Sequence, residues 1–171
     1  LTYQHFFINT KKKIPLEVRK SLGQFIHQIA HTATVEKDFF QPISTFIPPG
    51  VLPQSYQERN FTKTDEDILR KTLSELNEEI RILVPKERTS ESFLSELKIQ
   101  LKKLTNKVVL NEVELIEFRK RLNEGDYEIS LFAYIGNYPD PDGFLDSIRE
   151  NNFPGVNVNS GELFKVIRQI R

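Results

Sequence analysis

The second half of the chain alternates between strand-like and helix-like segments, and this alternation constrains the fold more than any other feature. Residues 80–84, 107–110 and 128–135 are rich in aliphatic, β-branched or aromatic side chains, which is typical of strands. Between them, residues 93–104 and 115–122 carry apolar side chains at helical spacing. The apolar pattern of the second helix consists of Leu115, Ile116 and Leu122. Helical crossovers of this length place successive strands parallel in one sheet. The sequence therefore predicts a βαβαβ unit.

The first half adds one strand and two helices to this unit. Aromatic and β-branched residues favour a strand over residues 2–8. After Pro15, the apolar stripe of an amphipathic helix consists of Val18, Leu22, Phe25, Ile26, Ile29 and Ala30. Residues 32–60 contain several prolines and little periodicity, as expected for an extended connector. Thr64 followed by Asp67 then resembles a capping box, and it predicts the start of a second helix.

Composition excludes several classes of function. The chain has 171 residues, enough for one domain with its own core. Its 24 basic and 24 acidic residues leave no net field that would attract nucleic acid or anionic lipid. The absence of cysteine excludes disulfides, thiolate nucleophiles and cysteine-ligated metals. No apolar run approaches the roughly 18 residues of a membrane span. A chain that opens on Leu1 and lacks methionine is expected to be a piece of a longer protein, with its localisation signals elsewhere.

The loop after the last predicted strand is the strongest candidate for a binding site. In open α/β sheets, ligands bind beyond the carboxyl ends of the strands. The last strand leads into residues 136–144, which are rich in glycine, proline, aromatic and acidic residues. Gly136 permits close approach of another backbone, and Tyr134 and Tyr138 offer flat walls for an apolar side chain. The same composition also fits a well-made turn, so both interpretations stay open.

Three other groups of residues have weaker claims to a function. Asp140 and Asp142 are a possible acid/base or metal pair, but aspartate beside proline is also ordinary turn chemistry. His27 and His31 face the same side of a helix, but no third metal ligand accompanies them. The lysine run 11–13 is typical of a solvated loop. The sequence contains no phosphate-binding glycine loop and no nucleophile motif, so we expect neither an enzyme nor a cofactor.

Several blocks of the chain, in order and spacing, resemble one known family. Residues 6–12 and 15–22 are similar to the "Asn-Thr-Lys" and "Val-Arg-Lys-Ala-Leu" blocks of extracellular solute-binding proteins that carry oligopeptides for ABC importers. Residues 46–50 resemble that family's Pro-Pro-Gly connector. Residues 125–128 and 138–141 resemble its "Gly-Asp-Tyr-Asp … Asp-Tyr-Pro-Asp-Pro" block. The likeness continues to a helix at residues 159–171.

The resemblance implies a fold and a domain organisation. It implies an α/β fold in which a mixed or parallel sheet is flanked by helices, as in one lobe of a periplasmic binding protein. Residues 1–171 would form a single domain, the C-terminal peptide-cleft lobe of a larger two-lobed protein. In that family an extended peptide lies between the lobes and adds its backbone to strand edges.

The resemblance also implies a ligand-binding set. The family's backbone contacts to the peptide map to Tyr134, Ile135 and Gly136. Its carboxylate for the peptide ammonium maps to Asn137, and losing that charge weakens ammonium capture by roughly tenfold or more. A ligand that need not have a free N-terminus is therefore expected. Tyr138 and Asp140 complete the set.

The function implied by the resemblance is capture of oligopeptides for an ABC importer. The partners would be a peptide or modified peptide and, in the intact protein, the permease subunits, with no nucleic acid and no membrane insertion by this segment. The expected location is the periplasm or cell envelope, where a lipid could anchor the full-length protein. The alternatives are a sensor of the same architecture, a receptor for a non-peptide solute, and a hydrolase that uses Asp140 and Asp142.

Overall fold

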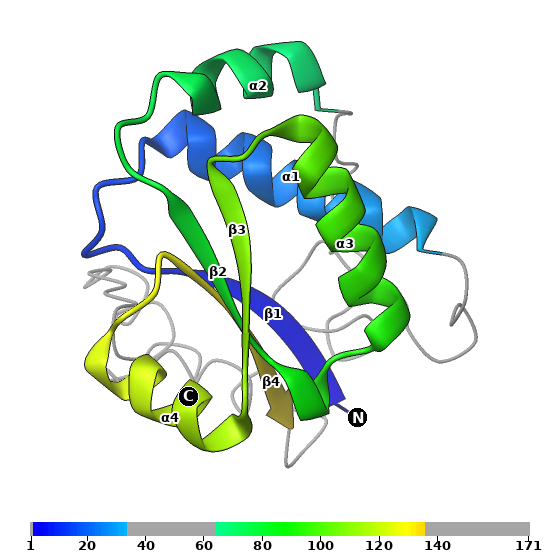
Figure 1. Cartoon of the computed structure of the whole chain (residues 1–171), viewed down its shortest axis with the longest axis vertical. Helices are drawn as coiled ribbons and strands as arrows, with labels where there is room; N and C mark the ends of the chain where they lie inside the picture. Colours follow the sequence, from blue (N-terminus) through cyan, green and yellow to red (C-terminus); the bar gives the residue numbers. More distant parts are fainter. Residues whose placement is uncertain (1, 34–63, 136–171) are drawn as a thin grey trace, which may run out of the picture.

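A four-stranded mixed sheet organises the part of the chain that the computed structural model describes, residues 2–33 and 64–135 (Figure 1). The elements in chain order are β1 (Thr2–Ile8), α1 (Leu16–Thr32), α2 (Glu66–Ser74), β2 (Ile80–Pro85), the 3-10 helix η1 (Lys86–Arg88), α3 (Glu91–Leu104), β3 (Val108–Val113), α4 (Leu115–Glu124) and β4 (Ile129–Ile135). No helix within the described ranges is long and apolar enough to cross a membrane. Most of the predicted connector and the predicted helix at 159–171 lie outside the described residues.

The order of the strands in the sheet is β1-β4-β2-β3. β2 runs parallel to both β3 and β4, so the predicted βαβαβ unit is confirmed. β1 pairs with β4 in the antiparallel direction along its whole length, from Thr2 opposite Ile135 to Ile8 opposite Ile129. The last strand of the chain's described part therefore lies inside the sheet, between the first strand and the second.

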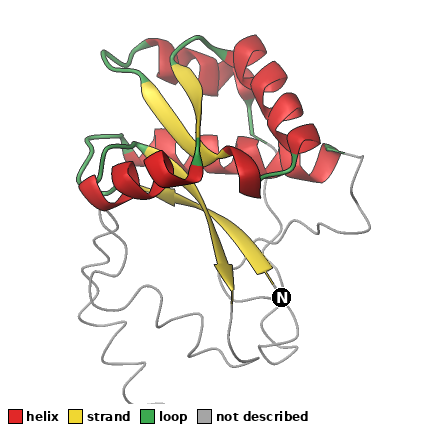
Figure 2. Cartoon of the chain, turned by 60° about the horizontal axis from the view of Figure 1, so that its bottom comes forward, coloured by secondary structure: helices red, strands yellow, loops and turns green. Residues whose placement is uncertain are grey.

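Helices cover the two faces of the sheet unequally. α1, α2 and α3 pack over one face, where Ile80, Ile82 and Val84 of β2 join the main hydrophobic core (Figure 2). α4 packs on the other face, where Leu83 of β2 meets Phe118, and these two residues belong to a smaller core. Because both faces of β2 are covered, its burial is almost continuous, as is usual for an interior parallel strand.

The helix predictions hold for existence and fail in some details. In α1, five of the six predicted apolar residues are buried and Ala30 is half-buried. In α4, Ile116 belongs to the apolar pattern that predicted the helix, but it is 86% exposed. Phe118 and Leu122 are four residues apart and therefore share the buried face, whereas Ile116 points away from it.

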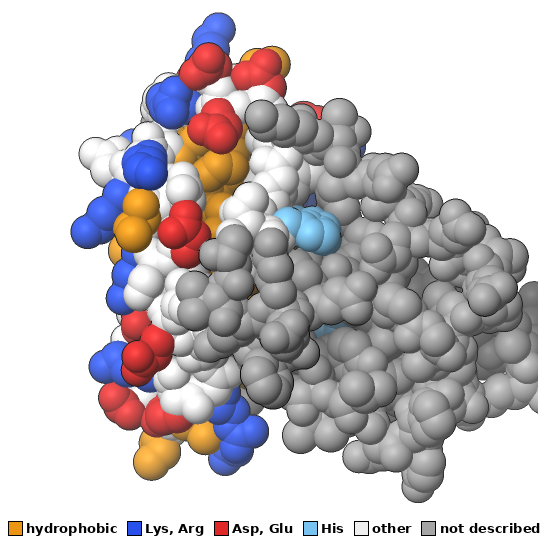
Figure 3. Space-filling view, turned by 90° about the vertical axis from the view of Figure 1, so that its right-hand side faces the viewer, with side chains coloured by type: hydrophobic (Ala, Val, Ile, Leu, Met, Phe, Trp, Pro, Cys, Tyr) orange, Lys and Arg blue, Asp and Glu red, His pale blue; other side chains and the backbone are white. Residues whose placement is uncertain are grey.

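Acidic and basic side chains are interspersed over the described part of the face shown in Figure 3, without a patch of one sign. This distribution agrees with the net charge of zero. The described part of this face therefore offers no broad electrostatic footprint for a polyanion.

The start of α2 differs from the predicted capping box. Asp65 is the N-cap, and its carboxylate accepts hydrogen bonds from the backbone N–H groups of Asp67 and Ile68. Thr64 is buried instead, and its hydroxyl lies 3.5 Å from the Ser21 carbonyl oxygen of α1. The hydroxyl of Thr64 is used to join two helices, so the neighbouring carboxylate takes the cap.

We predict that Asp65→Ala lowers the free energy of unfolding by about 1 kcal/mol, because two N–H groups at the start of α2 lose their acceptor. Asp65→Asn keeps an acceptor oxygen and should recover most of that loss. Denaturant titration of both variants measures the difference. Equal stability of Asp65→Ala and the wild type would contradict the assignment of the cap.

Candidate functional site

The carboxyl end of β4 extends beyond its parallel neighbour. The β2–β4 ladder consists of Ile82 opposite Ile129 and Leu83 opposite Ser130, and β2 ends soon afterwards at Pro85. The ladder with β1 continues to Ile135, so the start of β1 and the end of β4 extend together beyond the helices (Figure 2). Among the described residues, the end of β4 has a strand partner on the β1 side only. Backbone N–H and C=O groups at a strand edge without a partner strand can pair with an extended chain.

The loop that follows β2 is connected to the β1–β4 strand pair and is fixed by three hydrogen bonds. The Gln4 side chain of β1 donates to the Arg88 carbonyl oxygen at 2.6 Å. The buried Thr89 hydroxyl donates to the Pro85 carbonyl oxygen at 3.0 Å. The Ser90 hydroxyl caps α3. Because Gln4 lies opposite Ala133 in the ladder, the bond from Gln4 connects η1 to the strand pair that ends at the candidate site.

Charged residues of η1 also hold the start of α4. The Glu87 carboxylate accepts from the Leu115 backbone N–H at 3.1 Å, and Lys86 lies 3.3 Å from the Glu114 carboxylate. The backbone N–H groups of Glu87 itself and of Leu115 lower the pKa of the Glu87 carboxyl. These contacts thus join the turn that follows β2 to the start of the helix that follows β3, at the carboxyl ends of the two parallel strands.

The structure places only two of the predicted ligand-binding residues. Tyr134 and Ile135 are the last residues of β4, at the predicted strand end. The other four, Gly136, Asn137, Tyr138 and Asp140, lie outside the described residues. Asp142 lies outside them as well, so the acid/base alternative stays a prediction.

The histidine pair is on one face of α1, as its spacing indicates. The ring centroids of His27 and His31 are 4.6 Å apart. No group of three or more potential metal ligands occurs within residues 2–33 and 64–135. No described group adds a third ligand to the pair.

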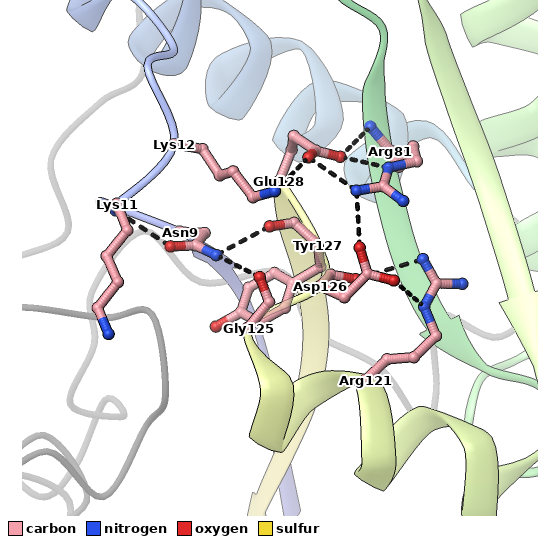
Figure 4. A network of polar contacts seen from close by, with 9 residues as sticks. All are labelled: Asn9, Lys11, Lys12, Arg81, Arg121, Gly125, Asp126, Tyr127 and Glu128. Atoms are coloured by element: carbon pink, nitrogen blue, oxygen red, sulfur yellow. Dashed lines mark hydrogen bonds and ion pairs between the residues drawn. The ribbon is translucent and has the colours of Figure 1, made fainter.

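A network of polar contacts around Asn9 lies at the other end of the sheet, where the parallel strands β2 and β4 begin (Figure 4). Asn9 directly follows β1 and is only 1% exposed. Its side-chain amide donates to the carbonyl oxygens of Gly125 and Tyr127, both at 3.0 Å, and its backbone N–H donates to the Glu128 carbonyl oxygen at 2.9 Å. One side chain therefore joins the end of β1 to the turn that leads into β4.

This turn requires a glycine. Gly125 ends α4 with a φ of 69°, a left-handed conformation that L side chains rarely adopt. The Asp126 N–H then donates back to the Arg121 carbonyl oxygen at 2.9 Å, which completes a Schellman-type end of the helix. The turn presents its carbonyl oxygens to Asn9.

Arg81 of β2 holds the other side of the same turn. Its guanidinium contacts Glu128 at 2.8 Å and Asp126 at 3.0 Å. Arg121 contacts Asp126 at 3.0 Å, and Lys12 contacts Glu128 at 3.3 Å. Burial by itself would raise the pKa of the Glu128 carboxyl, but the hydrogen bonds from Arg81 outweigh burial and the pKa is lowered. The hydrogen bond with Glu128 is also the main cause of the raised pKa of Arg81.

The network was not predicted as a unit. Its residues include parts of the lysine run and of the Gly-Asp-Tyr-Glu block, which the sequence presents as separate motifs. The one available signal was Arg81, a charged residue between the apolar Ile80 and Ile82 of a buried strand. Such a charge requires a partner. The network lies at the amino ends of the parallel strands, away from the candidate site at their carboxyl ends. Its role is therefore to support the fold.

We predict that Asn9→Ala lowers the free energy of unfolding by about 2–4 kcal/mol, because the carbonyl oxygens of Gly125 and Tyr127 both lose their donor. Asn9→Asp keeps the shape but replaces the donor with a carboxylate that repels the same oxygens. It should be at least as destabilising at neutral pH. Chemical denaturation measures both, and a loss below about 0.5 kcal/mol for Asn9→Ala would contradict the bridging role.

His5 of β1 gives the fold a second pH dependence, separate from that of the carboxylates. Burial lowers the pKa of His5 from 6.5 to about 4. The unfolded chain therefore binds the proton more readily between these values, and stability should fall as the pH drops from 6.5 to 4. The pKa difference corresponds to about 3 kcal/mol at most.

We predict that His5→Gln flattens the dependence of the free energy of unfolding on pH between pH 6.5 and about 5, because the glutamine side chain does not bind a proton in place of the imidazole. The lowered pKa values of Asp126 and Glu128 act at lower pH and remain in the variant. Urea denaturation across pH measures the profile. Identical slopes in both proteins, or a His5 resonance that titrates near 6.5, would contradict the prediction.

Comparison with solved structures identifies the fold. A periplasmic oligopeptide-binding protein of Borrelia burgdorferi matches 98% of this chain with a TM-score of 0.73 and 23% identity, and the match covers 36% of that protein. NikA of Brucella suis, solved with Fe(III)-EDTA, matches 89% of the chain with a TM-score of 0.66 and 18% identity, over 34% of its own length. OppA of Haemophilus influenzae, solved with the peptide RPPGFSPFR, matches 89% with a TM-score of 0.64 and 18% identity, over 33% of its length.

These matches confirm the predicted fold class, an α/β lobe of the periplasmic-binding-protein type. They confirm at the level of fold the likeness that the sequence blocks indicated. No protein-family model matches the sequence, and no curated protein sequence matches it. The chain spans about a third of the length of these three structures, 36% of the first and 34% of the second.

Proposed function

We propose that this chain is the C-terminal peptide-cleft lobe of a two-lobed solute-binding protein, and that it captures oligopeptides in an extended conformation for an ABC importer. The observation that carries the proposal is the end of β4, which has a strand partner on one side only among the described residues. The fold supports it, because the lobe type is that of oligopeptide-binding proteins of known structure.

The proposed binding mode is addition of the peptide as a further strand. Main-chain hydrogen bonds from Tyr134, Ile135 and Gly136 would hold the peptide backbone, and these bonds do not depend on the peptide's sequence. Tyr138 and Asp140 would flank the peptide in the following loop. The second lobe of the protein would close the cleft from the opposite side.

Asn137 sets the expected ligand chemistry within this proposal. A neutral amide forms a weaker hydrogen bond to an ammonium group than a carboxylate does, by a factor of roughly ten. The protein would therefore accept peptides whose N-terminus is blocked or modified nearly as well as free peptides. Its location would be the periplasm or cell envelope, and its protein partner the permease of the importer.

A receptor for a non-peptide solute is the second candidate. The match to NikA, which was solved with Fe(III)-EDTA, favours this alternative because the same lobe type there belongs to a protein that holds a metal chelate. The two candidates differ in whether the backbone edge of β4 pairs with the ligand. Peptide binding distinguishes them.

We predict that the full-length protein containing this chain binds a mixed library of short peptides and the same library N-acetylated with apparent affinities that differ by only a few fold. Asn137→Asp should restore a preference of about tenfold for the free peptides, since it supplies a carboxylate for the ammonium. Isothermal titration calorimetry measures both.

Binding of neither library would overturn the peptide proposal and favour the non-peptide solute. Binding of free peptides alone by the wild type would leave the receptor proposal standing and refute the interpretation of Asn137.

A further inference from the structure

Helix α1 carries two of the chain's three histidines on one side. His27 and His31 are four residues apart, about one helical turn, so their side chains are neighbours on the helix surface. Their ring centroids are 4.6 Å apart, and the ring planes are inclined by 57°, so the rings are tilted rather than stacked. Neither residue belongs to the apolar stripe of α1, and His31 is exposed. The pair is therefore a side-chain cluster outside the hydrophobic core.

The separation of the two rings is close to the separation that a shared metal ion imposes. An imidazole nitrogen binds a transition-metal ion at about 2.0–2.1 Å. Two imidazoles in adjacent positions of a square-planar or octahedral ion, at about 90°, have ring centroids roughly 4.5 Å apart. The rings of His27 and His31 already lie at 4.6 Å. Since Nε2 of His27 is buried, we expect this ring to rotate when the ion binds, with the helix unchanged.

The helix that carries the pair is held in place up to its last turn. Five side chains of α1, from Val18 to Ile29, are buried. At the end of the helix the Thr32 hydroxyl lies 3.2 Å and 3.1 Å from the carbonyl oxygens of Gln28 and Ile29, and the Ala33 N–H donates to Ile29 at 2.8 Å. Both histidines thus lie within a formed helix. Ligands on a fixed backbone lose less entropy when they bind an ion.

The place of the pair in α1 also favours a positive ion. His31 is the last but one residue of the helix. The carbonyl oxygens of the last turn carry a partial negative charge, which stabilises a nearby cation. From Gly23 to Thr32, the helix contains no lysine, arginine, aspartate or glutamate. No fixed positive charge of this part of the helix therefore repels the ion.

We propose that His27 and His31 together bind one transition-metal ion of the class that prefers imidazole, namely Cu²⁺, Ni²⁺ or Zn²⁺. Mg²⁺ and Ca²⁺ prefer oxygen ligands and are not expected there. Two imidazoles on one helix act as a chelate, so the second adds affinity at a small cost in entropy. Water would complete the coordination, since residues 2–33 and 64–135 contain no group of three potential ligands. The site is separate from the end of β4, and the proposal does not depend on peptide capture.

The experiment titrates the full-length protein, without a histidine tag, with nickel chloride at neutral pH in a calorimeter. His31→Gln removes one of the two ligands. The double variant with His31→Gln and Thr32→His keeps two histidines in α1 but places them five residues apart, on different faces of the helix. His5→Gln is the matched control, because it removes the histidine of β1 that lies outside the pair.

We expect the wild type and His5→Gln to bind Ni²⁺ equally well. His31→Gln and the double variant should bind it at least about tenfold more weakly, because only one imidazole remains on the face of His27. In the wild type, Ni²⁺ should also raise the midpoint of thermal unfolding by a few degrees, since the ion binds the helical form of α1. Magnesium chloride should leave the midpoint unchanged.

Three outcomes would overturn the site. The first is equal affinity of the wild type and His31→Gln for Ni²⁺. The second is undiminished binding by the double variant, because the spacing of the pair would then be irrelevant. The third is a loss in His5→Gln as large as that in His31→Gln, which would indicate an effect of histidine content alone. None of these outcomes bears on peptide capture, which the peptide libraries test by themselves.

Discussion

The position of β4 depends on the contacts that hold its first residues. The side chain of Asn9 donates to the carbonyl oxygen of Gly125, which lies 116 residues later in the chain, in the turn before β4. Arg81 forms ion pairs with Asp126 and Glu128 on the other side of this turn. β4 is thus fixed by both neighbouring strands at the point where it begins. Since the register of a strand is set along its whole length, these contacts also decide which residues of β4 arrive at the opposite edge.

The local elements were predictable from the sequence because they follow from side-chain periodicity. Apolar residues at spacings of two and of three to four indicate strands and helices without any knowledge of distant contacts. The errors occurred where two local solutions compete. Thr64 and Asp65 can both cap α2, and the hydroxyl of Thr64 is used by α1 instead. Ile116 is apolar, but the stronger pair of Phe118 and Leu122 decides which face of α4 is buried.

The arrangement of strands and the charges of the site were not predictable in the same way. Nothing local indicates that β4 inserts between β1 and β2, because pairing across most of the chain leaves no periodic trace. The predicted strand end at Tyr134 and Ile135 is confirmed, while their role in binding stays a prediction. The strand-end rule gave no sign that η1 holds the start of α4, since Lys86 and Glu87 look like solvated charges until their partners are known.

The two ends of the parallel strands have different physical properties, and this difference bears on function. The amino edge is the end where these strands begin, and the carboxyl edge is the end where they finish. At the amino edge, buried hydrogen bonds and paired charges leave little freedom to the turn before β4. At the carboxyl edge, a short stretch of β4 lacks a second partner strand among the described residues. A long unpaired edge promotes aggregation between copies of a protein, whereas a short one can pair with only a few residues of an extended segment. Because β4 is held firmly where it begins, its last residues can lack a second partner strand. A binding site built from strand backbone requires such an unpaired stretch.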